Sequence, residues 1–228
     1  LSLGLYLVLG TVTKTTAKGS RGGFTALAFL LMANVLVILA SSFQRLMLYE
    51  NAYGFSRLRT YTHIFIYWLA GLILAAIVLE LVKRRGRFAL ALLVAVVGFG
   101  ATMAIMNIDG FIVQRNVARA EAGDELDVVH LTTLSADAVP QLLQQYQESG
   151  LGLEVKNGLG TALACMEKVT NDPADLPWQE YNFAQARAVQ LLRDNAPSWN
   201  QFKPYQVNQE WMIQLNGKEI SCSNYVID

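Results

Sequence analysis

The sequence predicts a mainly α-helical, multi-pass membrane protein with a C-terminal, mostly helical extracytoplasmic domain that ends in a β-hairpin. Three observations lead to this fold class. The 228-residue chain contains three long apolar runs, its charge differs sharply between its two halves, and its last part has the alternation and turn residues of a hairpin. We therefore expect a membrane domain over residues 1–106 and an extracytoplasmic domain over residues 107–228.

Each apolar run is long enough to cross a hydrocarbon core of about 30 Å, because an α-helix rises about 1.5 Å per residue. We expect transmembrane helices at residues 24–43, 64–82 and 88–106. The only Lys, Arg, Asp or Glu inside these runs is Glu80, which a surface ion pair with Lys83 or Arg84 would explain.

A further apolar stretch, residues 1–12, is too short to span a membrane and lacks the basic start and cleavage site of a signal peptide. We expect it to be the tail of a truncated transmembrane helix, with more helices upstream in the intact protein. A re-entrant or interfacial segment is the alternative.

The charge distribution predicts the orientation. Residues 1–106 hold ten basic and two acidic side chains, whereas residues 107–228 hold eight basic and sixteen acidic ones. The loop at 13–23 and the turn at 83–87 are basic and contain no acid. Short basic loops stay in the cytoplasm, so the connection at 44–63 and residues 107–228 are expected on the outer side.

The predicted spans give little indication of a transport pathway. Asn34 is their only strongly polar side chain near mid-membrane, whereas transporters and pumps usually carry ionisable or helix-breaking residues there. The third span is rich in small residues, and the pairs Ala91 with Ala95 and Gly100 with Ala104 favour close packing against the second span.

The connection between the first two spans holds the densest group of potentially functional side chains. Its first half has apolar residues on one helix face, Gly54 interrupts that helix, and the following residues favour a helix that continues into the second span. Arginines suit anions and histidine titrates near neutral pH. The candidate anion- or lipid-binding residues are Arg57, Arg59, Tyr61 and His63. The alternatives are basic residues that snorkel at a helix end, or arginines that neutralise acids of the outer domain.

The outer domain is expected to be helical at 107–122, 137–150, 159–169 and 178–194, followed by a hairpin near 211–222. Asp137 is the expected N-cap of the second of these helices, with Pro140 in its first turn. Asn216 and Gly217 suit the type I′ turn of the hairpin.

Cys165 and Cys222 are the only cysteines, and both fall in the outer domain. An oxidising compartment would permit a disulfide worth about 3–4 kcal/mol in the chain-entropy model. Two buried free thiols are the alternative. With two histidines and no paired cysteine motif, we expect no metal site and no cofactor.

Catalytic motifs are incomplete. A Ser/His/Asp arrangement can be written with Ser135, His130 and Asp127, but no nucleophile elbow is present and sequence neighbours rarely form a triad. The acidic segment at 121–127 lacks the ordered ligand spacing of a calcium loop, so we expect a solvated acidic turn.

Three stretches together resemble bacterial multi-pass proteins catalogued as domain of unknown function 4173, related to 4153. They are the run from Arg45 to Phe65, the segment from Asn107 to Arg119, and Leu126-Asp127 followed by Leu131 and by residues 135–140. The resemblance covers about residues 30–145. It implies a bacterial inner-membrane protein with further N-terminal helices and no established activity.

We expect a non-enzymatic anchor or accessory subunit that contacts the lipid bilayer and binds a protein partner through its outer domain, with no nucleic-acid partner. The first alternative is a membrane-interface enzyme acting on a lipid-linked or envelope substrate through the Arg57–His63 segment. The second is a transport or sensory component, which requires polar residues in upstream helices.

Overall fold

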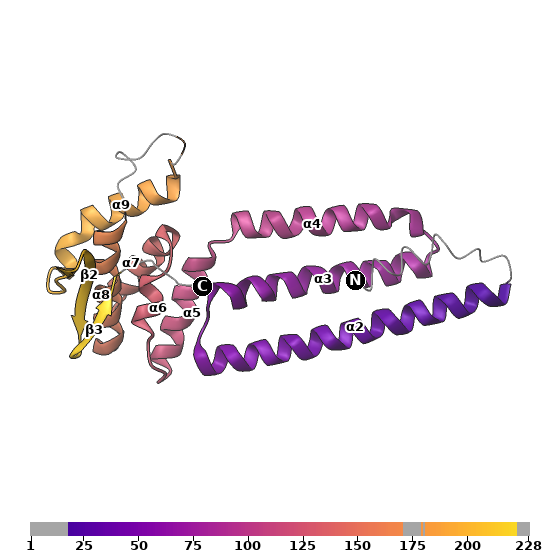
Figure 1. Cartoon of the computed structure of the whole chain (residues 1–228), viewed down its shortest axis with the longest axis horizontal. Coiled ribbons are helices and arrows are strands. Elements are labelled where there is room, and N and C mark those ends of the chain that lie inside the picture. The colour runs from indigo at the N-terminus through magenta and orange to yellow at the C-terminus, as the bar shows by residue number, and fades with distance from the viewer. Residues whose placement is uncertain (1–17, 171–178, 180, 223–228) are drawn as a thin grey trace. The chain divides into compact units, whose positions relative to one another are not determined.

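The computed structural model describes residues 18–170, 179 and 181–222, and it divides into two compact units (Figure 1). The membrane unit comprises the residues up to Tyr53 together with Leu58–Ile105, and the polar unit comprises Gly54–Arg57 together with the residues from Met106 onward. The helix tail predicted at 1–12 lies outside the described residues. The four residues Gly54–Arg57 therefore group with a part of the chain that follows them by about 50 positions.

The membrane unit contains three long helices, each apolar enough by length and composition to cross a membrane. They are α2 (Lys18–Tyr53), α3 (Arg57–Leu81) and α4 (Phe88–Ile105), with the short 3-10 turn η1 (Arg85–Arg87) before α4. α2 is longer than predicted, and residues 18–23 are helical where a loop was expected. The segment at 44–53 contains no Gly or Pro that would end a helix, so α2 continues to Gly54, as the sequence analysis expected of this connection.

The three helices of the membrane unit share a small apolar core to which α2 contributes Ala28 and Met32 and α4 contributes Phe88. Most other large apolar side chains on these helices are exposed, as expected for a lipid-facing surface. Of the small residues in the third span, Ala91 and Ala95 pack against this core, whereas a Cβ on Gly100 would meet open space.

A contact between α3 and α4 centres on Trp68. Its indole ring covers Gly98, where a Cβ would overlap the ring. The indole N–H donates a 3.1 Å hydrogen bond to Thr102 Oγ1, and that hydroxyl donates to the carbonyl of Gly98 at 2.8 Å. Close approach at a small residue together with an interhelical hydrogen bond is typical of helix packing in membranes.

Glu80 corrects a detail of the sequence analysis. It is 5% exposed, and its carboxylate accepts a 3.3 Å hydrogen bond from Thr25 Oγ1 on α2. The acid is therefore buried and contributes to contact between α2 and α3, whereas the sequence analysis expected it at the exposed end of the helix.

The polar unit is built around α8 (Leu153–Val169), which contacts all of its other α-helices and strand β2. The remaining helices are α5 (Ile108–Glu121), α6 (Val128–Thr132), α7 (Val139–Gln147) and α9 (Phe183–Asn195), with 3-10 turns η2 (Ala136–Ala138) and η5 (Ala196–Trp199). The core side chains with less than 2% exposure include Ile112, Leu131, Leu142, Leu163 and Trp199.

Three helix starts in the polar unit differ from the prediction, and the first is that of α8, which begins six residues before the predicted position 159. Asp137 lies inside η2, whose N-cap is Ser135, and α7 begins after Ala138 without a side-chain cap, although Pro140 does lie in its first turn. α9 begins at Phe183 with Asn182 as its N-cap, five residues after the predicted start. Asn182 is the stronger signal because its side chain accepts from the backbone N–H of Ala184.

The C-terminal sheet has three antiparallel strands in the order β1 (Tyr205–Val207), β2 (Glu210–Leu215) and β3 (Lys218–Ser221). The predicted hairpin is confirmed as β2 and β3, with φ of 52° at Asn216 and 79° at Gly217 in the turn. β1 was not predicted, because it is three residues long and its turn contains Asn208 and Gln209 without a glycine.

Candidate functional site

The segment Gly54–Arg57 is held by side chains of the polar unit, and we call this arrangement the loop clasp. It comprises Gly54–Arg57 with Asp109, Asn116 and Ser135. Asp109 follows its partner Arg57 by 52 residues in the sequence, and Asn116 follows its partner Phe55 by 61. The clasp thereby brings together residues from the three stretches that carry the family resemblance.

Asp109 is the centre of the loop clasp. The residue is 6% exposed and lies in the first turn of α5. Arg57 reaches it with both arms of its guanidinium, Nε to Oδ1 at 2.7 Å and Nη2 to Oδ2 at 2.5 Å. Ser135 adds its backbone N–H at 2.8 Å and its hydroxyl at 2.5 Å, both to Oδ2. A bidentate arginine and two further donors satisfy a buried carboxylate in a fixed orientation.

The pKa of Asp109 reflects two opposing influences. Burial is the largest single influence and raises the pKa, but hydrogen bonds from Arg57 and Ser135 together with the charge of Arg57 lower it, so the net pKa is below the usual value of 3.8. Asp109 is therefore ionised at neutral pH, and its charge is balanced by Arg57.

Asn116 binds the backbone of the loop from α5. Its Oδ1 accepts from the N–H of Phe55 at 2.8 Å, and its Nδ2 donates to the carbonyl of Phe55 at 3.0 Å. The Phe55 ring meets Phe111 edge to face with centroids 5.9 Å apart. The side-chain amide thus replaces the backbone partners that a strand neighbour would supply.

Gly54 permits this approach. Its φ is +79°, and a Cβ there would lie 2.7 Å from Arg119 Nη1 and 2.9 Å from Asn116 Oδ1. A side chain at this position would meet both a strained backbone and the amide that holds Phe55.

His130 lies next to the clasp, on the short helix α6. Burial lowers its pKa below 6.5, the nearby Asp127 raises it, Arg57 lowers it, and a hydrogen bond to the Phe55 backbone raises it. Its Nε2 is buried and has no hydrogen-bond partner among the described residues. Asp127 accepts from the backbone N–H of His130 as the N-cap of α6, and Ser135 donates to Asp109, so the suggested Ser/His/Asp triad does not form.

The predicted anion-site residues divide between the two units of the structure. Arg57 belongs to the polar unit and binds Asp109, whereas Arg59 and His63 belong to the membrane unit. At about 100° per residue, positions 59 and 63 share a helix face that turns away from position 57. Arg59 lies 5.9 Å from the centroid of the Tyr53 ring, and Tyr61 is 40% exposed.

His63 has a partner that the sequence analysis overlooked. Its Nδ1 lies 3.2 Å from Oε1 of Glu50, which is 3% exposed on α2, and its ring lies 4.9 Å from that of Phe43. Glu50 was counted as an acid of the connection because the predicted span ended at residue 43. The signal available was that it is the only acid between the two spans.

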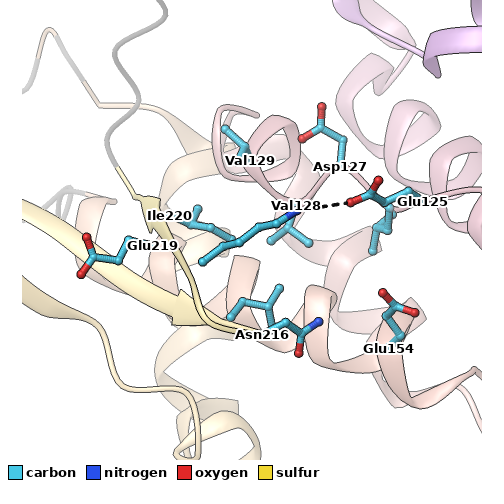
Figure 2. A pocket seen from close by; sticks show the side chains of 11 residues that line it. Glu125, Asp127, Val128, Val129, Glu154, Asn216, Glu219 and Ile220 are labelled. Atoms are coloured by element: carbon cyan, nitrogen blue, oxygen red, sulfur yellow. Dashed lines mark ion pairs between the residues drawn. The ribbon is translucent and has the colours of Figure 1, made fainter.

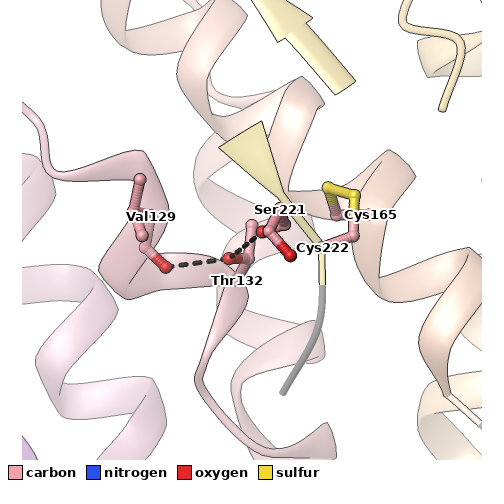
Figure 3. Close-up of a disulfide and its surroundings, with 5 residues drawn as sticks. All are labelled: Val129, Thr132, Cys165, Ser221 and Cys222. Atoms are coloured by element: carbon pink, nitrogen blue, oxygen red, sulfur yellow. Dashed lines mark hydrogen bonds between the residues drawn. A yellow bond between two sulfur atoms is a disulfide. The ribbon is translucent and has the colours of Figure 1, made fainter. Parts of the chain in front are cut away.

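The disulfide considered from the sequence is present in the structure, between Cys165 on α8 and Cys222 after β3, with Cα atoms 5.0 Å apart (Figure 3). Cys222 also donates its N–H to the carbonyl of Trp211 at 2.7 Å. The end of the sheet is therefore tied to the central helix of the polar unit. Among the described residues, no group of three or more His, Cys, Asp or Glu side chains is placed to hold a metal ion.

Comparison with known proteins identifies the family. No curated protein and no solved structure matches the chain. The profile of a family described as domain of unknown function (DUF4153), the related family named above, matches residues 1–145. This range contains every residue of the loop clasp and ends before Cys165 and the sheet. The chain belongs to the DUF4153 family.

Proposed function

We propose that this chain is a multi-pass protein of a bacterial inner membrane, a non-enzymatic anchor or accessory subunit whose outer domain binds a protein partner. Three apolar helices support insertion into a bilayer. The basic turn between α3 and α4 supports a cytoplasmic location for that turn. Alternating passes then bring Gly54–Arg57 and the residues after α4 to the same outer side, as their grouping in one unit requires.

The observation that carries the non-enzymatic proposal is the pairing of Arg57 with Asp109. Arg57 was one of the candidates for binding an anion, and its Nε and Nη2 both donate to a buried carboxylate. An arginine neutralised within its own chain positions a loop and does not offer a charge to a ligand. The loop clasp therefore holds Gly54–Arg57 against α5 within the polar unit.

A membrane-interface enzyme is the second candidate, and the pair of Glu50 and His63 favours it. A buried carboxylate 3.2 Å from an imidazole is an arrangement used for proton transfer. Arg59, on the same face of α3 as His63, would then be the residue nearest to a lipid phosphate.

Gentle extraction from the native membrane followed by native mass spectrometry tests the two candidates. The accessory-subunit proposal expects one protein partner at a fixed stoichiometry, retained in His63→Gln and reduced in Asp109→Asn. A chain without a protein partner that carries one specific lipid, lost in His63→Gln, would instead support the enzyme.

A further inference from the structure

A groove of about 510 Å³ opens between strand β3 and the segment that leads into α6 (Figure 2). Its apolar part includes Val128 and Ile220, which are 8% and 7% exposed. Its polar part includes the carboxylates of Glu125, Asp127 and Glu154. The groove therefore combines an apolar base with acidic walls, within a single unit of the molecule.

The edge of β3 lines this groove. β3 is the last strand in the order β1-β2-β3, so within the described part of the chain one of its edges has no strand neighbour. The two-residue turn makes Leu215 and Lys218 a hydrogen-bonded pair, and Ile220 pairs with Ile213 in the same way. Backbone groups alternate along a strand, so the N–H and C=O of Glu219 face away from β2. The edge is closed further along, where the Thr132 hydroxyl contacts the carbonyl of Ser221 at 3.5 Å (Figure 3).

The described residues that line the groove carry a net negative charge. Among them Lys218 is the only basic residue, and its Nζ lies 4.0 Å from Glu125 Oε1 with both side chains more than 80% exposed. An ion pair with both side chains this exposed contributes little to stability. Glu219 is turned to the other side of β3 (Figure 2), where it accepts a 2.8 Å hydrogen bond from the Tyr205 hydroxyl. Three carboxylates therefore face a groove that holds one exposed lysine.

We propose that the outer edge of β3 and this groove bind an extended segment of a partner protein that carries Lys or Arg at alternate positions. An added strand would pair with the outward backbone groups of Glu219, place apolar side chains over Val128 and Ile220, and bring basic side chains to the acidic walls. This inference rests on the proposed function, because it assigns the partner-binding surface of the accessory subunit.

Peptide binding to the full chain in nanodiscs of zwitterionic lipid tests the inference. The probe is the fluorescein-labelled peptide Lys-Val-Lys-Val-Lys-Val-Lys, followed by fluorescence anisotropy. We expect saturable binding that weakens about tenfold or more in Glu125→Gln/Asp127→Asn/Glu154→Gln and also weakens with added salt. Asparagine keeps the N-cap of α6 at position 127.

The matched control is Glu148→Gln/Asp194→Asn/Glu210→Gln, which changes the net charge equally at exposed acids outside the groove. We expect its affinity to equal that of the unmodified chain. Lys218→Gln removes the one basic side chain among the described lining residues, and the variant is expected to bind the peptide about three times more tightly because the repulsion of this lysine is relieved. This gain is measurable even if the triple variant fails to fold.

A second peptide of the same sequence, with every backbone amide N-methylated, keeps the charge and the side chains and removes the N–H groups that pair with a strand. Strand addition predicts that it does not bind. Equal affinity for the two peptides, equal weakening by both triple variants, or no binding of the unmethylated peptide would each overturn the inference. None of these results affects the proposed function, because a stoichiometric partner found by native mass spectrometry would then bind elsewhere on the chain.

Discussion

At the scale of single residues, Asp109 organises the candidate site. Its carboxylate accepts two hydrogen bonds from the guanidinium of Arg57 and two from Ser135, at distances of 2.5–2.8 Å. In Asp109→Asn, the guanidinium of Arg57 would face a neutral amide that also presents N–H groups toward it. Asp109 therefore matters because it holds Arg57 and Ser135 in position.

Asp109→Asn is expected to lower the free energy of unfolding by about 1–3 kcal/mol. This is less than the loss from a fully buried pair, because the Arg57 side chain is 35% exposed. Differential scanning fluorimetry of the detergent-solubilised chain measures the change. The matched control is Asp124→Asn, whose carboxylate is 53% exposed and pairs with Arg119 at 3.2 Å; its expected cost is below about 0.5 kcal/mol. Equal losses of unfolding free energy in the two variants would show that the loop clasp does not stabilise the fold.

The pH dependence of stability separates Asp109 from His130. Both have a pKa lowered by folding, so each contributes less to stability as pH falls through the interval between its unfolded and folded pKa. For His130 the loss begins below its ordinary value of 6.5, and for Asp109 it begins below 3.8. We expect His130→Gln to remove the loss in the upper interval alone and Asp109→Asn to remove it in the lower interval alone. Melting temperatures measured from pH 8 to pH 3 test this expectation. A variant that still lost stability within the pH interval of the residue it replaces would contradict it.

At the scale of elements, the break between α2 and α3 matters because it places a loop in the polar unit. Gly54→Ala would force a Cβ into a left-handed backbone and displace the Asn116 amide from Phe55. Gly217→Ala is a matched control, since Gly217 has the same φ of +79° and a Cβ there meets nothing within 4 Å. We expect the alanine at 54 to cost about 1–2 kcal/mol more, from the lost hydrogen bonds. Equal melting temperatures of the two variants would mean that the amide contact contributes nothing.

The disulfide is the second link between elements, and it joins α8 to the end of the sheet. Cys165→Ser/Cys222→Ser is expected to lower the stability of the polar unit by about 4 kcal/mol in the chain-entropy model, because the bond closes a 57-residue separation. Limited proteolysis should then cut first within β2 and β3, while α2, α3 and α4 remain protected by the bilayer. Unchanged protection of the strands would show that packing alone holds the sheet.

The sequence predicted elements well where one local signal dominated. The three apolar helices and the turn at Asn216 and Gly217 follow from composition and turn chemistry. β1 escaped because its turn contains Asn208 and Gln209, which adopt positive φ without the usual glycine. The predicted span at 24–43 is shorter than α2 because hydropathy marks the lipid-crossing part of a helix and not its more polar ends.

The site was harder to predict than the elements. Arg57 was named, and one alternative paired these arginines with acids of the outer domain, but its partner Asp109 is 52 residues away and was not singled out. Glu50 and His63 were both within the connection, yet their pairing depends on α2 and α3 running back along each other. Such contacts depend on tertiary packing, and local periodicity carries no information about them.

At the scale of the whole molecule, the account depends on the side of the membrane on which the polar unit lies. The grouping of Gly54–Arg57 with the residues after α4 requires both segments to be on one side, and the four basic residues of the turn at 83–87 favour the outer side for them. A domain that contains a disulfide also fits an oxidising compartment.

Labelling of single introduced cysteines with a membrane-impermeant maleimide tests this claim most directly. The native cysteines are joined in a disulfide and do not react, so Glu148→Cys reports the polar unit and Gly86→Cys reports the basic turn without removing any of its charges. In intact spheroplasts, we expect Glu148→Cys to be labelled at once and Gly86→Cys only after permeabilisation. The reverse pattern would place the polar unit in the cytoplasm and contradict the account of an outer, partner-binding domain.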